Sequence, residues 1–194
     1  DLDAFLVDPR PYYAVHRARL RALASIQPTR THRFFARLEA DGRLLGVITQ
    51  NIDGLHQQAG SKNVLEVHGS LATAHCLGCR ATYSRTIVET LIEQADVARC
   101  TSCGGVIKPD VVFFGEAVRY LEEAAELVEA ADLLFVVGSS LMVYPAAALP
   151  SHGTAPIVVV NRGPFAYEAI PRARLALHAE DDIDSFFAAV AERL

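Results

Sequence analysis

The four cysteines of the chain form its clearest chemical pattern. They make two C-x2-C pairs within one short segment, at Cys76, Cys79, Cys100 and Cys103. Two such pairs at this spacing are typical of a structural zinc site, in which four thiolates surround the metal at about 2.3 Å. Four thiolates leave no open coordination position. We therefore expect a metal that stabilises a small ribbon and takes no part in catalysis.

Two disulfide bonds are the alternative use of these cysteines, because paired cysteines in secreted proteins are usually oxidised. The printed sequence begins at Asp1 and shows no charged and then apolar export signal. We therefore expect reduced cysteines, a bound zinc ion and a cytoplasmic protein.

Polar residues follow four short apolar runs, and these are the second chemical signal. In parallel α/β sheets, ligands bind beyond the carboxyl ends of the strands. Amide, hydroxyl and carboxylate groups at such ends suit the ribose, phosphate and carboxamide groups of a nucleotide. The four polar segments are Thr49–His56, Glu66–Ser70, Gly138–Ser140 and Asn161–Gly163.

Each of these polar residues also has an ordinary interpretation. Asp53 could cap the short helix that ends at Gly60. His68 could be a structural histidine, and Ser139 or Asn161 could be turn residues. Their joint placement after apolar runs is what favours a ligand site.

The elements that must position these residues alternate between helix and strand. Apolar spacing predicts helices over 12–23, 31–38, 86–94 and 121–131, with others beginning near Pro145 and Asp182. Apolar runs predict strands over 44–49, 64–67, 111–114, 133–137 and 157–160. This alternation predicts an α/β fold with a parallel sheet covered on both faces.

Composition excludes several classes of protein. The chain has 194 residues and a formal net charge of −5, and 51% of its residues are hydrophobic. This length fits one domain with a small insertion. No apolar run reaches the roughly 18 residues that a membrane span needs. The mild acidity and the scattered cations argue against direct nucleic-acid binding.

Six ordered motifs occur along the chain, at Thr49–His56, Glu66–Gly69, the paired C-x2-C, Lys108–Glu116, Gly138–Leu141 and Val160–Asn161. Together they resemble the motifs of the sirtuins, which are NAD-dependent protein lysine deacylases. The resemblance covers essentially the whole chain and implies a Rossmann-like parallel sheet with helices on both faces and a small inserted zinc-ribbon and helical module. It places a helical module at 1–43, the NAD-binding domain at 44–70 and 108–194, and the zinc-binding module at 71–107.

The resemblance also assigns roles to individual residues. It makes His68 the general base and a catalytic residue together with Asn51. The residues that it places against NAD are Gln50, Asn51, Ile52, Asp53, Gly138, Ser139, Ser140, Asn161, Arg162, Gly163 and Asp181. Those that it places against the acyl-lysine substrate are Val112, Phe114, Gly115, Val143 and Tyr144.

The implied reaction transfers an acyl group from protein lysine to the ADP-ribose part of NAD. Nicotinamide leaves, His68 helps a ribose hydroxyl to react, and water completes the transfer to give free lysine and O-acyl-ADP-ribose. The implied partner is an acyl-lysine protein or peptide, and we expect a monomer. Two alternatives stay open: an ADP-ribosyltransferase or NAD hydrolase that uses the same pocket, and a catalytically inactive, zinc-stapled binding module.

The resemblance leads us to expect a further strand and a Gly-Ala-Gly-x-Ser phosphate loop ahead of the printed residues, which contain no such motif. We expect either that this segment precedes Asp1 in the protein or that the chain is an inactive remnant. Acyl preference is a separate expectation. A His16-x-x-Arg19 pair could bind an acidic acyl group, but a solvated helix face is the simpler interpretation, so we predict acetyl-lysine as the better substrate.

Overall fold

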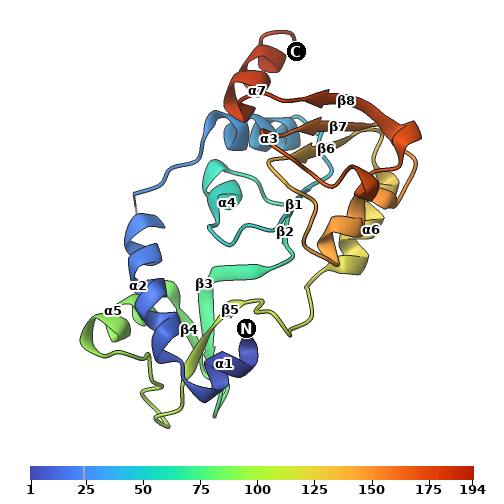
Figure 1. Cartoon of the computed structure of the whole chain (residues 1–194). Helices are drawn as coiled ribbons and strands as arrows, with labels where there is room; N and C mark the ends of the chain where they lie inside the picture. The colour runs from blue at the N-terminus through green and yellow to red at the C-terminus, as the bar shows by residue number, and fades with distance from the viewer. Residues whose placement is uncertain (24) are drawn as a thin grey trace. The chain divides into compact units, whose positions relative to one another are not determined.

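The computed structural model describes residues 1–23 and 25–194, and these form two compact units (Figure 1). Unit 1 comprises Asp1–Gln27, Gln50–Gly54 and His68–Arg119. Unit 2 comprises Pro28–Thr49, Leu55–Val67 and Tyr120–Leu194. Each unit is therefore assembled from segments that are far apart in the sequence.

Unit 1 is built on a three-stranded antiparallel sheet with the strand order β4-β3-β5. The strands are β3 (Gly69–Cys76), β4 (Thr82–Ser84) and β5 (Ile107–Val111). Three helices complete the unit: α1 (Leu2–Val7), α2 (Arg10–Leu23) and α5 (Arg85–Gln94). Residues such as Tyr13 and Leu20 of α2 and Val88 of α5 recur at helical spacing and share one apolar core with the sheet.

Unit 2 contains the parallel strands, which are divided between two sheets. β1 (Val47–Thr49) pairs with β2 (Val64–Glu66). β6 (Leu134–Val137), β7 (Ile157–Val160) and β8 (Leu175–Ala179) form the second sheet in that order. The predicted α/β class with parallel pairing is confirmed.

Both faces of the sheet β6-β7-β8 are covered, as the sequence predicts. Val136, Ile157 and Val159 pack in one cluster with the 3-10 helices η1 (Ala146–Ser151) and η2 (Tyr167–Ala169). The alternating residues Phe135, Val158 and Val160 pack with α3 (Arg30–Ala40) and α7 (Ile183–Ala191). Because side chains on a strand point alternately to its two faces, a strand buried on both faces is apolar throughout, like Ile157–Val160.

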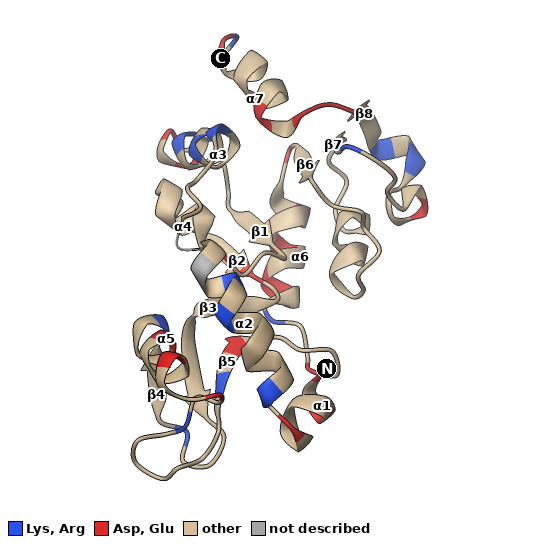
Figure 2. Cartoon of the chain, turned by 60° about the vertical axis from the view of Figure 1, so that its left-hand side comes forward, with Lys and Arg blue, Asp and Glu red and all other residues tan. Residues whose placement is uncertain are grey.

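Three further elements complete unit 2: α4 (Leu55–Ala59), α6 (Leu121–Ala130) and η3 (Arg172–Arg174). Figure 2 shows acidic residues along α6 and basic residues along α3. Glu122 and Glu123 lie in the first turn of α6, where the helix dipole favours negative charge. Among the described residues, no helix is both long and apolar enough to cross a membrane.

Some predicted elements differ from the observed ones. The strand expected at 111–114 ends at Val111, because the chain turns between Phe113 and Glu116. The strand expected from 44 begins at Val47, and the helix expected near Pro145 is a 3-10 helix with Pro150 inside it. β8 was not predicted, because its burial is only partial, it contains no β-branched residue, and His178 interrupts its apolar residues.

Candidate functional site

The four cysteines lie together in unit 1: Cys76 ends β3, Cys79 lies in the turn between β3 and β4, and Cys100 and Cys103 lie in the loop that precedes β5. All four Sγ atoms lie within 4.8 Å of one another. The Sγ atoms of Cys76 and Cys103 are 3.5 Å apart, as are those of Cys79 and Cys100. A disulfide would need about 2.05 Å, whereas sulfurs around a tetrahedral zinc ion lie about 3.8 Å apart. The disulfide alternative is therefore wrong, and the cluster has the geometry of a metal site.

Backbone and side-chain donors surround these sulfurs. The backbone N–H of Gly78 donates to Cys76 Sγ at 3.3 Å, and the hydroxyl of Tyr83 donates to Cys100 Sγ at 3.0 Å. A Cβ at Gly105 would lie only 2.9 Å from Cys76 Sγ, so only glycine leaves room for the sulfur there. The surroundings thus favour thiolates in a tight cradle.

The ionisation of the cysteines shows what a cation would supply. The Tyr83 hydroxyl lowers the pKa of the Cys100 thiol, which favours its thiolate. The backbone N–H of Gly105 also lowers the pKa of Cys103, but the three neighbouring sulfurs outweigh it and raise that pKa to about 12. Repulsion among thiolates therefore opposes the last deprotonation, and a divalent cation at the centre would remove this opposition.

His68 precedes β3 and contacts the segment Gln50–Gly54 of the same unit. Its Nδ1 lies 3.2 Å from the backbone oxygen of Gln50. A carbonyl oxygen only accepts hydrogen bonds, so Nδ1 carries a proton, and in the neutral form of the ring the lone pair is on Nε2. His68 is half-buried. The structure thus presents it in the tautomer that a base at Nε2 requires.

The chain on either side of His68 is tightly specified. The backbone N–H of Val112 donates to the His68 oxygen at 2.8 Å, and that of Leu71 donates to the Ile52 oxygen at 3.3 Å. Gly69 has φ +75°, and a Cβ there would lie 2.0 Å from the backbone oxygen of Asp110. Glycine is therefore required next to His68 for two reasons, its backbone conformation and the close approach of β5.

The other predicted residues of unit 1 lie near the surface of this region. Asn51 is exposed, and Ile52 and Asp53 are half-buried. Phe114 is 79% exposed, and Gly115, with φ +97°, has open space beside its Cα. Structure within unit 1 therefore brings together the predicted base, the segment after β1 and the predicted substrate segment.

The predicted residues of unit 2 gather at one edge of the sheet β6-β7-β8. Gly138 follows β6 and donates its N–H to the Val160 oxygen at 3.0 Å. Asn161 follows β7 and donates its N–H to the Ala179 oxygen at 3.1 Å. These bonds place the carboxyl ends of three neighbouring strands side by side, as in a ligand-binding edge.

Side chains at this edge differ in how firmly they are held. Asn161 is 7% exposed, and its Nδ2 donates to the Gly163 oxygen at 3.1 Å. Ser139 Oγ accepts from the N–H of Leu141 at 3.2 Å, whereas Ser140 is exposed. At this edge the side-chain amide of Asn161 is thus held in place, whereas Ser140 is exposed to solvent.

Four further predicted residues are exposed in unit 2. Arg162 lies 3.7 Å from Asp182, in an ion pair that solvent weakens. Asp181 accepts the N–H of Asp182 at the start of α7. Val143 and Tyr144 are 41% and 64% exposed in the loop before η1. All four therefore have surface accessible to a ligand.

The helix expected to influence acyl preference contains a buried histidine. His16 is 4% exposed and stacks on Tyr12, with their ring centroids 5.1 Å apart. Arg19 is exposed. His16 therefore packs in the core of unit 1 and does not form, with the exposed Arg19, an accessible pair for an acidic acyl group.

Comparison with known proteins decides the family. A family model described as the Sir2 family matches residues 1–145. The chain belongs to the Sir2 family. This confirms the resemblance to sirtuins that the sequence motifs indicate.

Relatives within the family carry consistent names. An NAD-dependent protein deacetylase of Saccharolobus solfataricus is 43% identical over 149 residues, which are 77% of this chain and 60% of the relative. Another, of Caldivirga maquilingensis, is 38% identical over 188 residues, which are 94% of this chain and 73% of the relative. The aligned part of the chain thus spans 60% of the length of the first of these relatives.

Solved structures of Sir2 proteins are similar over the whole chain. A complex described as Sir2 with a p53 peptide and NAD+ is similar with a TM-score of 0.92 and 36% sequence identity. The alignment covers 100% of this chain and 81% of the Sir2 chain in that complex. A Sir2 protein bound to a propionylated peptide has the same TM-score and identity, with 82% of its own chain covered.

Sequence reasoning missed several residues that support the site. Tyr83 and Gly105 shape the cysteine cradle, and no spacing rule indicates either of them. The pairing of Lys108 with Glu116 was also missed, although both lie in a quoted motif, because nothing in the sequence shows that Lys108 is buried.

Proposed function

We propose that this Sir2-family protein is an NAD-dependent protein lysine deacetylase. It would transfer the acetyl group of a protein or peptide lysine to the ADP-ribose part of NAD, with water as a further reactant, and release nicotinamide, O-acetyl-ADP-ribose and free lysine. The names of its relatives and the peptide and NAD complexes of similar structures support this assignment. The observation that carries it in this chain is the tautomer of His68, which leaves Nε2 free to accept a proton.

The donor set of the chain fits the proposed cofactor. NAD supplies, when bound, a ribose carbon from which nicotinamide departs. Asn51 and Asp53 would bind the ribose and the carboxamide through their amide and carboxylate groups, with Gln50 and Ile52 completing this side. His68 would take a proton from a ribose hydroxyl at Nε2, while its Nδ1 keeps its own proton and donates it in a hydrogen bond to the Gln50 oxygen.

The edge of the sheet in unit 2 would hold the rest of the cofactor. Its polar groups suit ribose hydroxyls and phosphate oxygens, and the backbone of Gly163, with φ +86°, has open space beside it for a close approach. The residues assigned here are Gly138, Ser139, Ser140, Asn161, Arg162, Gly163 and Asp181.

The substrate would be a neutral acyl-lysine that contacts exposed apolar side chains. Phe114 and Tyr144 are 79% and 64% exposed, and a neutral acyl-lysine loses less hydration energy against such surfaces than a charged ammonium does. Val112, Gly115 and Val143 would complete this part of the site. We retain acetyl over acidic acyl groups, because His16 is buried in the core.

We further propose zinc as the metal of the four-cysteine cluster. Four thiolates in tetrahedral geometry are the donor set that zinc prefers in structural sites. Its role would be to join the loops on both sides of β4 and α5. A cytoplasmic location fits reduced cysteines, and we propose a monomer that acts on protein lysine and binds neither membrane nor nucleic acid.

The deciding experiment measures nicotinamide release by the full-length protein with NAD, with and without an acetyl-lysine peptide. We expect release only when the peptide is present. We expect His68→Ala to abolish the formation of deacetylated peptide, because His68 acts after nicotinamide has left. His152→Ala is the matched control, because His152 is a half-exposed histidine far along the chain, paired only weakly with Glu129. Release without the peptide would favour a hydrolase or ADP-ribosyltransferase, and no release or NAD binding at all would favour a binding module.

A further inference from the structure

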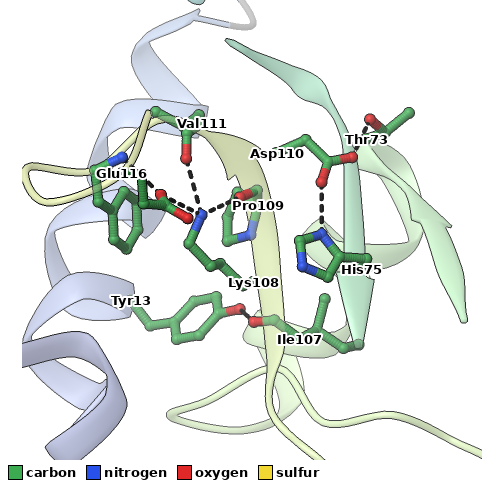
Figure 3. A network of polar contacts seen from close by, with 10 residues as sticks. Tyr13, Thr73, His75, Ile107, Lys108, Pro109, Asp110, Val111 and Glu116 are labelled. Atoms are coloured by element: carbon green, nitrogen blue, oxygen red, sulfur yellow. Dashed lines mark hydrogen bonds and ion pairs between the residues drawn. The ribbon is translucent and has the colours of Figure 1, made fainter. Parts of the chain in front are cut away.

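Lys108 on β5 is a buried cation with every donor satisfied. It is 3% exposed. Its Nζ donates to the backbone oxygens of Pro109 at 3.3 Å and Val111 at 2.9 Å, and it pairs with Glu116 Oε2 at 2.8 Å (Figure 3). Three acceptors thus match the three protons of the ammonium group. A cation removed from water in this way is retained only where its partners are fixed.

Glu116 has a second task, because the same carboxylate oxygen also binds the backbone. Its Oε2 accepts the N–H of Phe113 at 2.8 Å, and its own N–H donates to the Phe113 oxygen at 2.9 Å. These contacts close a four-residue turn in which Gly115, with φ +97°, takes the third position. Phe114 occupies the second position and therefore projects outward, which explains its exposure.

The segment between Val111 and Glu116 is thus held at both ends by one ammonium group. Lys108 binds the Val111 oxygen at the start and Glu116 at the end, and its Nζ lies 4.3 Å from the centroid of the Phe113 ring in between. Val112, which directly follows Val111, donates its backbone N–H to the backbone oxygen of His68. Lys108 and Glu116 therefore hold a segment that is itself hydrogen-bonded to the backbone of the proposed base, His68.

We propose that Lys108 and Glu116 are positioning residues for the acyl-peptide substrate. They hold Val112–Gly115 in the conformation that receives the peptide and keep this segment in register with His68. Neither side chain needs to touch the substrate, because Lys108 is buried and its protons are all engaged. This inference rests on the proposed deacetylase function.

A purely structural role is the competing explanation, and β5 offers a matched control for it. The hydroxyl of Tyr13, a residue with 0% exposure, donates to the backbone oxygen of Ile107, which directly precedes Lys108 (Figure 3). Tyr13→Phe removes a buried hydrogen bond to the same strand and leaves the segment 112–116 untouched. It should lower thermal stability without changing how the peptide binds.

The test compares Lys108→Met, Lys108→Arg, Glu116→Gln and Tyr13→Phe in the full-length protein. It measures the melting temperature, and kcat and the peptide KM at saturating NAD. We expect Lys108→Met to raise the peptide KM about tenfold with a smaller change in kcat, because a charged hydrogen bond that orders the segment is lost. Lys108→Arg should recover part of this loss. Glu116→Gln, which keeps the side-chain volume, serves where Lys108→Met does not fold.

Amide hydrogen exchange gives a second measure that does not depend on turnover. The amides of Val112 and Phe113 should exchange faster in Lys108→Met and Glu116→Gln than in the wild type or in Tyr13→Phe. A peptide KM within twofold of the wild-type value in these variants, or an equal rise of KM in Tyr13→Phe, overturns the inference while the deacetylase function stands. A wild-type protein that releases no nicotinamide with acetyl-peptide overturns both.

Discussion

Acidification from pH 7 to pH 5 should weaken unit 1 through one buried histidine. Burial, together with the positive charges of Arg19 and Arg85, lowers the pKa of His16 from 6.5 to about 4, and Glu89 partly opposes this shift. Tyr12 covers one face of the ring and has its hydroxyl 3.4 Å from Nδ1. The folded protein therefore keeps this imidazole neutral at a pH where the unfolded chain protonates it.

The sign and size of the effect follow from the two pKa values of His16. Between pH 6.5 and 4 the unfolded state binds more protons than the folded state, so the free energy of unfolding falls as the pH falls. The loss is about 2 kcal/mol at pH 5 and approaches about 3 kcal/mol near pH 4. The pKa of Asp110 is also lowered, because hydrogen bonds from Thr73 and His75 outweigh its burial. Its contribution to stability is lost only below about pH 4.

The assay is urea unfolding followed by circular dichroism at pH 7, 6 and 5, with zinc supplied throughout. His16→Gln is the matched variant, because glutamine can still bond the Tyr12 hydroxyl but does not titrate. We expect the wild type to lose about 2 kcal/mol more than the variant between pH 7 and pH 5. Equal losses in the two proteins would refute the assignment of a neutral buried His16.

Three further perturbations test other parts of the structure. Gly69→Ala should lower the free energy of unfolding, measured by thermal melting, by about 3 kcal/mol or more, because its Cβ would overlap the Asp110 oxygen. Gly42 has a similar φ of +70° but open space beside it, so Gly42→Ala should lower the free energy of unfolding by only about 1 kcal/mol. Removing the metal with a chelator, or changing Cys79→Ser, should unfold the ribbon around β4 by circular dichroism, and elemental analysis should find zinc in the native protein only; a metal-free protein with unchanged melting would contradict this. Phe187→Ala should lower the free energy of unfolding by about 3–5 kcal/mol, because this side chain is 1% exposed. A urea midpoint near that of the wild type would show that the surrounding aromatic residues repack.

Local patterns predicted the parts of the fold that local forces specify. The run Ile157–Val160 is a strand because β-branched residues that are buried on both faces read alike in sequence and structure. The paired cysteines predicted their own cluster, because metal geometry constrains spacing along the chain. β8 was missed because an edge strand such as Leu175–Ala179 is partly exposed and lacks that apolar signature.

The sequence by itself determined the family, the cysteine pattern of the cluster, the candidate base and the α/β class, because these depend on residue types at short and regular spacings. Tertiary structure alone decided which nitrogen of His68 carries the proton, why Gly69 must be glycine, and that Lys108 is buried against Glu116. Each of these depends on a contact with a residue brought close by folding or on the removal of water. Neither such a contact nor the burial of a residue can be inferred from its neighbours in the sequence.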